Sequence, residues 1–226
     1  MEQHFCQSCG MPLDKENRGT EAGGAVSSDY CRYCYNEGKF TRNFTMTQMI
    51  EFCLQFLDQI NAQTGQNVEP MQAKEQMLRH FPTLKRWSMP DNRTIEQKAA
   101  DLLEMCDNVT VASVNADGYP RPVQMSKIHA VGFSDVWMAT SAGSVKVADF
   151  RLNNKAGLCY EYYGDGVALR GTVEIVTDDA IRREMWHEWF IHHFAGGQAD
   201  PDYVLLHFMG KDAAIWINAE LKHLNL

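Results

Sequence analysis

The sequence predicts a mainly β chain with helices, of the α+β class, in which a β-barrel follows a small cysteine-rich module and a helical linker. Three observations predict this order. Two Cys-x-x-Cys pairs stand near the N-terminus, apolar residues at helical spacing follow them, and about six short alternating segments divided by turn residues fill the second half. The expected domains are residues 1–42, 43–93 and 94–226.

The first 42 residues carry the pattern of a zinc-binding module. The four candidate ligands are Cys6, Cys9, Cys31 and Cys34. The two pairs are separated by 21 residues, a distance at which four thiolates can hold one tetrahedral Zn²⁺. The apolar side chains available for a core are Met11, Leu13, Val26 and Tyr30. So little apolar bulk needs a metal or disulfides to fold, and we favour zinc over the disulfide alternative.

Two amphipathic helices are expected in the linker. Apolar residues at helical spacing run from Met46 to Ile60, and the first helix should end at Asn61–Gly65. The second helix follows Pro70 and should end at Pro82–Trp87.

The barrel domain should begin with a helix. Thr94 and Gln97 have the spacing of a capping box, and this helix should run to about Cys106. The elements expected after it are strands 109–115, 119–129 and 133–139, a helix 144–152, strands 157–163 and 167–176, a helix from Asp178 to His193, and strands 204–209 and 213–217. Antiparallel strands of this number suggest a small closed barrel.

Composition and charge narrow the classes of partner. The chain has 21 basic and 29 acidic side chains, a net charge of −8, and none of its three parts is basic. Because nucleic acids demand a positive face, DNA or RNA is not expected as a partner. The sequence shows neither a secretory signal nor an apolar run of membrane-spanning length. With its paired free thiols, the protein is expected in a reducing cytoplasm and not at a membrane.

Hydroxyl groups and cations gather at two places in the predicted barrel. Thr140 and Ser141 lead into a helix start that carries Ser144 and Lys146, and unpaired amides at a helix start attract anions. Arg121, on the second strand, could add a bidentate grip on the same phosphate. The alternatives are that Ser144 only caps its helix and that Lys146 is only solvated.

Residues from about 94 to 218 resemble the pyridoxamine-phosphate-oxidase-like flavoproteins, the FMN-binding split barrels, and within them the general stress protein branch. The matching segments are Asp117–Val123, Trp137–Ser141 with Ser144-x-Lys146, Asn153–Ala156 and Gly171–Val176. The ordered set carries the resemblance, and no single segment does. Residues 1–42 resemble a zinc-ribbon family that is found fused to other bacterial domains.

The resemblance implies an FMN bound at a homodimer interface. In such proteins the arginine and the Ser-x-Lys helix start hold the phosphate, the strand after the arginine runs beneath the isoalloxazine, and a Thr-Ser segment flanks the ribityl chain and the phosphate. The cofactor-binding residues implied here are Arg121, Pro122, Val123, Gln124, Met125, Ser126, Thr140, Ser141, Ser144, Val145 and Lys146. No catalytic acid or base is implied, because the flavin itself carries out the redox step.

The chain also departs from the oxidases of this family. The oxidases carry a lysine a few residues after the arginine. In this chain the counterpart is Lys127, six residues after Arg121, and we do not assign Lys127 to the site. The arginine-histidine segment that grips pyridoxamine phosphate has no match in 211–226, which argues against vitamin B6 as the substrate. A partner-chain aromatic often covers the flavin. Trp186 and Trp216 are candidates, although a core position is the favoured interpretation of both.

Three functions compete. The first is an FMN-dependent oxidoreductase that passes electrons from a reduced nicotinamide to an acceptor. The second is a flavin-binding redox sensor without turnover, with the ribbon docking a protein partner. The third, a nucleic-acid adaptor, lacks the basic surface that it needs. Haem or another flavin in the same barrel is an alternative cofactor.

Overall fold

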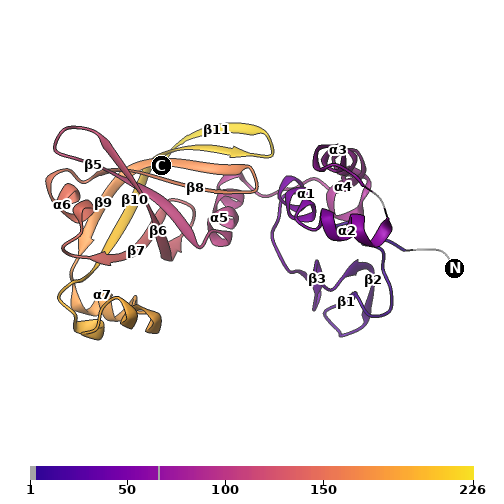
Figure 1. Cartoon of the computed structure of the whole chain (residues 1–226), viewed down its shortest axis with the longest axis horizontal. Helices are drawn as coiled ribbons and strands as arrows, with labels where there is room; N and C mark the ends of the chain where they lie inside the picture. Colours follow the sequence, from indigo (N-terminus) through magenta and orange to yellow (C-terminus); the bar gives the residue numbers. More distant parts are fainter. Residues whose placement is uncertain (1–3, 66) are drawn as a thin grey trace. The chain divides into compact units, whose positions relative to one another are not determined.

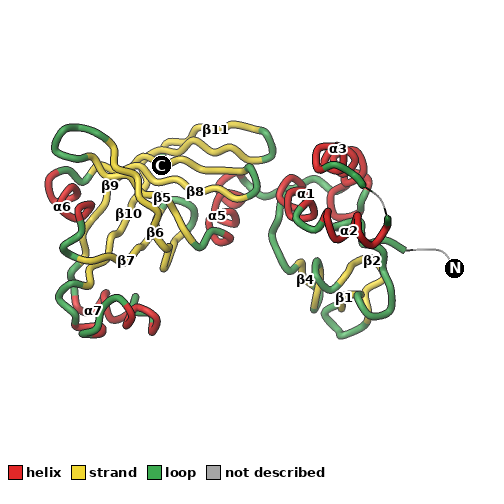
Figure 2. Tube along the Cα trace, viewed as in Figure 1, coloured by secondary structure: helices red, strands yellow, loops and turns green. Residues whose placement is uncertain are grey.

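Six antiparallel strands close into a barrel in the second half of the chain (Figures 1 and 2). They are β5 (Asn108–Val114), β6 (Pro120–Val131), β7 (Asp135–Ser141), β8 (Lys155–Tyr162), β9 (Asp165–Val176) and β10 (Tyr203–Ile217). Their order is β10-β7-β6-β5-β8-β9, and β9 pairs with β10 again to complete the ring. β11 (Glu220–Asn225) adds to β10 as an extra strand. The mainly β fold with helices is therefore confirmed.

The computed structural model describes residues 4–65 and 67–226 and divides the chain into two units, residues 1–92 and 93–226. In the second unit, side chains of the strands alternate between a packed interior and the outer surface. Val109 and Val111 of β5 point inward, as do Val136 and Met138 of β7, and all four are buried. This alternation is the period-2 pattern from which the strands were predicted.

Three α-helices accompany the barrel. They are α5 (Ile95–Met105), α6 (Val145–Leu152) and α7 (Asp179–Glu184), and two short 3₁₀ segments follow at Glu188–His192 and Gly197–Ala199. α5 packs Leu102 and Leu103 into the barrel core, and the buried Tyr160 hydroxyl donates to the Phe133 carbonyl at 2.9 Å. α6 contributes Val147 and Phe150 to the same core. The helices are thus fixed by burial rather than by helix propensity alone.

The first unit combines two small sheets with helices. Its elements are β1 (Arg18–Thr20), β2 (Val26–Cys31), β3 (Tyr35–Asn36), β4 (Lys39–Phe40), α1 (Met46–Leu54), α2 (Leu57–Thr64), α3 (Pro70–His80), a 3₁₀ turn (Phe81–Thr83) and α4 (Lys85–Ser88). β1 pairs with β2 and β3 pairs with β4. Within residues 4–65 and 67–226, no helix combines the length and the apolar character that a membrane crossing requires.

Several local predictions are confirmed. Thr94 and Gln97 form the capping box, with the Gln97 amide donating to Thr94 Oγ1 at 3.3 Å and the Thr94 amide donating to Gln97 Oε1 at 2.8 Å. Asp178 accepts from the amides of Ala180 and Ile181 and caps α7. The helical stretch that was expected to end at Asn61–Gly65 ends there, because α2 stops at its C-cap Gly65, whose φ is 68°.

Other local predictions are wrong. The helix from Asp178 ends at Glu184 instead of His193, because Trp186 and Phe190 turn to pack on Tyr203 with ring centroids 5.3 and 5.7 Å away. The expected helix 46–60 is broken at Gln55 and Phe56 into α1 and α2. Aromatic packing accounts for the early end of α7, which the apolar spacing of the sequence does not reveal.

The last strands also differ from the prediction. Strands 204–209 and 213–217 are one strand, β10, with an irregularity between Gly210 and Asp212. β11 was not expected, and it follows a turn in which Asn218 and Ala219 both have positive φ. In the first unit, Val26 was expected in the small core but is 64% exposed. The rings of Tyr30, Tyr35 and Phe40 form the apolar cluster there instead.

A substitution of Gly171 on β9 tests how closely β9 and β10 approach where the barrel closes. A Cβ on this residue would lie 2.1 Å from the Met209 carbonyl oxygen and 2.8 Å from Phe208 Cζ, both on β10. Because the obstacle is backbone, we expect Gly171→Ala to lower the free energy of unfolding by about 3 kcal/mol. The matched control is Gly157→Ala on β8, where the nearest atoms are 3.8 and 3.9 Å away. Urea denaturation measures both variants, and equal stabilities would contradict the prediction.

Candidate functional site

The four cysteines of the first unit come together in one cluster. The Sγ atoms of Cys6, Cys9, Cys31 and Cys34 all lie within 4.8 Å of one another, and three of the four residues are buried. Cys9 Sγ and Cys31 Sγ are 3.9 Å apart, while a disulfide needs about 2 Å. Four sulfurs around one Zn²⁺ at about 2.3 Å would be separated by about 3.8 Å. The donor set and its spacing therefore fit a zinc tetrathiolate and not disulfides.

Backbone groups support the sulfur cluster. The Cys31 amide donates to Cys6 Sγ at 3.3 Å, and the Gly10 amide donates to the Cys6 carbonyl at 2.9 Å. Gly10 has a φ of 74°, which other residues rarely adopt. Hydrogen bonding among the four thiols, with the Cys31 thiol as the largest cause, lowers the pKa of Cys6, and the same contacts raise the pKa of Cys9. A thiolate is the form that binds metal.

The helical residues of the first unit hold the first cysteine knuckle. Arg86 Nη1 donates to the buried Ser8 Oγ at 3.0 Å, and Trp87 Nε1 donates to the Ser8 carbonyl at 2.7 Å. The Arg86 guanidinium also lies 4.0 Å from the ring centroid of Phe40, in cation–π contact. Residues of α4, which lies about 80 residues later in the sequence, thereby hold the loop between Cys6 and Cys9 in place.

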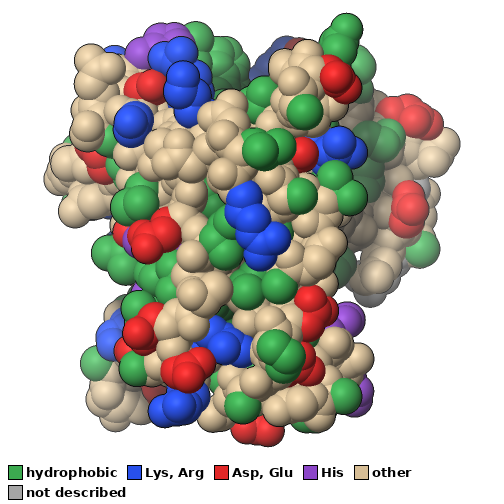
Figure 3. Space-filling view, turned by 90° about the vertical axis from the view of Figure 1, so that its left-hand side faces the viewer, with side chains coloured by type: hydrophobic (Ala, Val, Ile, Leu, Met, Phe, Trp, Pro, Cys, Tyr) green, Lys and Arg blue, Asp and Glu red, His purple; other side chains and the backbone are tan. Residues whose placement is uncertain are grey.

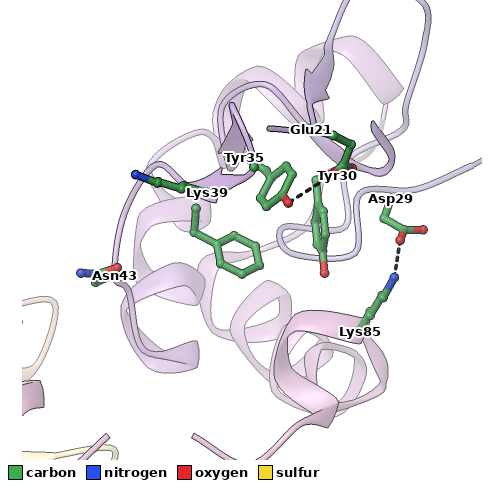
Figure 4. A pocket seen from close by; sticks show the side chains of 9 residues that line it. Glu21, Asp29, Tyr30, Tyr35, Lys39, Asn43 and Lys85 are labelled. Carbon is green, nitrogen blue, oxygen red and sulfur yellow. Dashed lines mark hydrogen bonds and ion pairs between the residues drawn. The ribbon is translucent and has the colours of Figure 1, made fainter. Parts of the chain in front are cut away.

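A cavity of about 660 Å³ lies beside the ribbon strands (Figure 4). Its apolar wall is formed by Tyr30, Tyr35 and Phe40, whose ring centroids are 4.9 to 5.3 Å apart. In Figure 4 the Tyr35 hydroxyl points to Glu21, to which it donates at 3.0 Å. The rings contact one another, so this cluster is the apolar core of a small module as well as the wall of the cavity.

The start of α6 in the barrel unit gathers unpaired donors. Ser144 is the N-cap residue, but its hydroxyl makes no capping bond, and its buried Oγ has no hydrogen-bond partner among the residues that the structure describes. The amides of Val145 and Lys146 lie in the first turn, where N–H groups have no acceptor within the helix. Partial burial lowers the pKa of Lys146, and among the described residues no carboxylate forms an ion pair with its amine. These groups can bind an anion.

Arg121 is brought to the same helix by an ion pair. Its Nε donates to Asp149 Oδ2 at 3.0 Å, and Asp149 lies one helical turn after Val145. Asp149 is buried and also accepts from Ser113 Oγ at 2.7 Å. Sequence reasoning missed both Asp149 and Ser113. An acidic residue in an amphipathic helix gives no signal that it faces inward, and only the barrel closure brings it to Ser113.

The stretch 121–126 does not present all its side chains to one side. Through its pairing with β5, β6 directs Arg121, Val123 and Met125 to the face that carries Val109 and Val111, and Met125 is buried in the core. The exposed side chains Pro122, Gln124 and Ser126 lie on the opposite, outer face. A ligand on the outer surface would therefore meet Gln124 and Ser126 but not the side chain of Met125.

Thr140 and Ser141 differ in their surroundings. Thr140 is buried on β7, while Ser141 Oγ donates to Asp202 Oδ1 at 2.8 Å. The same carboxylate oxygen accepts from the Gly143 amide at 3.3 Å, so Asp202 fixes the loop into α6. Lys127 lies elsewhere: its amine donates to the carbonyl oxygens of Leu103 and Glu104 at the end of α5.

The face of the barrel unit drawn in Figure 3 carries basic, acidic and apolar side chains in small, interspersed groups. No continuous basic patch covers this face. Such a surface offers single cationic positions to a small anion rather than a track for a nucleic-acid backbone.

A family model described as "Pyridoxamine 5'-phosphate oxidase like" matches residues 96–225, more than half of the chain. The chain belongs to the pyridoxamine 5'-phosphate oxidase-like family. A second model, described as "Putative zinc ribbon domain", matches residues 5–88 and thus includes the helical segment as well as the cysteines. No curated protein matches the chain.

Solved structures share the barrel of this oxidase-like family. A Clostridium acetobutylicum protein related to general stress protein 26 of Bacillus subtilis, of the pyridoxinephosphate oxidase family, is 25% identical with a TM-score of 0.52, covering 57% of this chain and 92% of that one. General stress protein 26 of Bacillus anthracis is 19% identical with a TM-score of 0.51, covering 58% and 98%. A heme binding protein of Mycobacterium smegmatis is 10% identical with a TM-score of 0.50, covering 60% of each chain. The last two likenesses show the fold alone.

The cysteine cluster generates a metal-binding prediction. Because the cluster offers four thiolates to one ion, we expect about one zinc per chain in the purified protein and a large loss of zinc in Cys6→Ser. The matched control is Cys159→Ser, which removes an exposed thiol of the barrel. Elemental analysis measures the zinc. Thiols must lose protons to bind, so acidification should release the metal. Full zinc content in Cys6→Ser would contradict the assignment.

Proposed function

We propose that this protein is a cytoplasmic FMN-binding flavoprotein, with an oxidoreductase activity and a structural zinc in its N-terminal ribbon. The observation that carries the proposal is the group of unsatisfied donors at the start of α6, above all the buried Ser144 Oγ, which has no partner within residues 4–65 and 67–226. A buried hydroxyl without a hydrogen bond costs free energy, and a phosphate oxygen would satisfy it. The residues present therefore fit a phosphate ester.

The proposed phosphate site divides its tasks among three side chains. Lys146 supplies a positive charge that no carboxylate among the described residues neutralises. Ser144 supplies a hydroxyl donor, and the first-turn amides supply the favourable end of the helix dipole. Arg121, held at Asp149, retains guanidinium N–H groups for the ligand because the ion pair uses Nε. Together they match the anionic end of a mononucleotide.

Bound FMN would supply electron and hydride transfer. The chain's own part is to hold and orient the cofactor and to exclude water. In this proposal the outer face of β6, with Gln124 and Ser126, lies against the ring system. Cys159, Gln124 and Thr110 line a shallow hollow of about 160 Å³ on that face. These side chains offer hydrogen bonds to a flat polar ring.

A homodimer is part of the proposal. Trp216 is 45% exposed and its strand neighbour Leu221 is 52% exposed, so the outer edge of the barrel presents large apolar side chains. Exposed apolar groups that lie together favour association with another protein surface. Trp186, the other candidate aromatic, packs against Phe190 and Tyr203 within its own chain. Trp216 is therefore the better candidate to reach a partner's flavin. The docking of a protein partner by the ribbon stays a prediction.

The first experiment is the visible absorption spectrum of the purified protein, with the released cofactor identified after heat denaturation and the mass measured by light scattering. A yellow dimer that releases about one FMN per chain supports the proposal. A Soret band would identify haem instead, the ligand named for the Mycobacterium smegmatis protein of similar fold. Oxidation of a reduced nicotinamide by the FMN-loaded protein would distinguish an oxidoreductase from a flavin-binding sensor.

The double variant Arg121→Ala/Lys146→Ala tests the phosphate site. Loss of both cations should weaken FMN binding at least about a hundredfold, since each charge-assisted contact contributes about 1.5–3 kcal/mol. The matched control is Arg183→Ala/Lys211→Ala, which removes two exposed cations of the same unit. Fluorescence titration with FMN measures both. Stoichiometric FMN retained by the first variant would contradict the site assignment.

The lowered pKa of Lys146 predicts a pH dependence. Burial disfavours the charged amine, so Lys146 loses its proton at a lower pH than an ordinary lysine does. The affinity for FMN relative to riboflavin should therefore fall as the pH rises toward about 10.4, the usual lysine value. Riboflavin lacks the phosphate and corrects for titration of the flavin ring. Lys146→Arg should remove the decrease, and an unchanged decrease in that variant would contradict the prediction.

A further inference from the structure

A single carboxylate oxygen joins two barrel strands to α6. Asp149 Oδ2 accepts from Ser113 Oγ at 2.7 Å and from Arg121 Nε at 3.0 Å. Ser113 and Arg121 are direct cross-strand partners of β5 and β6. The side chain of Asp149 is only 9% exposed, while that of Arg121 is 43% exposed. The buried carboxylate of Asp149 is therefore held in the barrel, while the guanidinium of Arg121 extends from it toward the surface.

The arrangement restricts how the guanidinium can lie. Arginine is planar and presents its five N–H donors in a rigid fork, so fixing Nε also fixes the direction of the terminal nitrogens. An unrestrained arginine would lose side-chain entropy on binding a ligand. Contact with Asp149 removes part of that freedom before the ligand arrives. Ser113 in turn fixes the carboxylate that fixes the arginine.

We propose that Asp149, held by Ser113, is a positioning residue that aims Arg121 at the phosphate bound at the start of α6. This inference rests on the proposed FMN site and assigns to it two residues that do not themselves touch the ligand. Asp149 belongs to the helix whose first turn carries Val145 and Lys146, so the same element presents the amides and orients the arginine. Pre-organisation of this kind raises affinity without adding a contact.

Two effects of the carboxylate on anion binding have opposite signs. By its charge alone, Asp149 would repel a phosphate, and its removal would tighten binding. By holding Arg121, it strengthens binding, and its removal would weaken it. The direction of the change therefore separates a positioning role from mere proximity, and dependence on Arg121 separates it from a general loss of structure.

The experiment is a double-mutant cycle of Asp149→Ala and Arg121→Ala, read by fluorescence titration with FMN and with riboflavin at fixed ionic strength. We expect Asp149→Ala to weaken FMN binding about tenfold and to change riboflavin binding less than about twofold. In the Arg121→Ala background, Asp149→Ala should cause no further weakening. Ser113→Ala keeps the carboxylate and removes one of its two bonds, so it should weaken FMN binding by a smaller factor, again only when Arg121 is present.

Several outcomes would overturn the inference. FMN binding that is unchanged or tighter in Asp149→Ala would make the carboxylate a bystander or a competitor. Equal weakening for riboflavin, or in the Arg121→Ala background, would make it a structural residue. If Asp149→Ala does not fold, Ser113→Ala decides by the same criteria. A parent protein that binds neither flavin overturns the proposed function and the inference together, while a parent that binds FMN without coupling between the two sites overturns the inference alone.

Discussion

The barrel depends on the double pairing of β10. Along Tyr203–Met209 this strand is hydrogen-bonded to β7 on one edge, and along Leu205–Trp216 it is hydrogen-bonded to β9 on the other. Without it, β7 and β9 would be the free edges of an open sheet. The pairing demands close backbone approach, which is why glycine occupies position 171 opposite Gly210. One strand thus converts an open sheet into a closed barrel with a packed interior.

The candidate anion site takes its rigidity from that closure. α6 is anchored in the core by Val147 and Phe150, so its first turn is held at a fixed place on the barrel surface. The loop before it is tied to Asp202, next to the start of β10. A site built on elements that are fixed by packing keeps its donors aimed without a ligand. The burial of Val147 and Phe150 therefore holds the helix start, with its first-turn amides, at a fixed place on the barrel.

The sequence was sufficient for features whose signal is local. Cysteine spacing predicted the sulfur cluster, and capping residues predicted the starts of α5 and α7. Residues fixed by long-range packing gave no such signal. The helix from Asp178 ends early because Trp186 and Phe190 pack against Tyr203. Asp149 faces inward, where its carboxylate accepts a hydrogen bond from Ser113. In the candidate site, the donors of the helix start were predictable from Ser144 and Lys146, but the residue that orients Arg121 was not.

The place of β10 in the chain has a consequence for the timing of folding. The barrel cannot close until this strand exists, and it pairs with β7, about 65 residues earlier. Strand pairs so distant in sequence form slowly. The cysteines of the cluster, Cys6 to Cys34, are at most 28 residues apart in the sequence, and their assembly requires a metal ion instead. During synthesis the ribbon can therefore fold while the barrel strands still expose their edges, and in that interval they are the part of the chain most prone to aggregate.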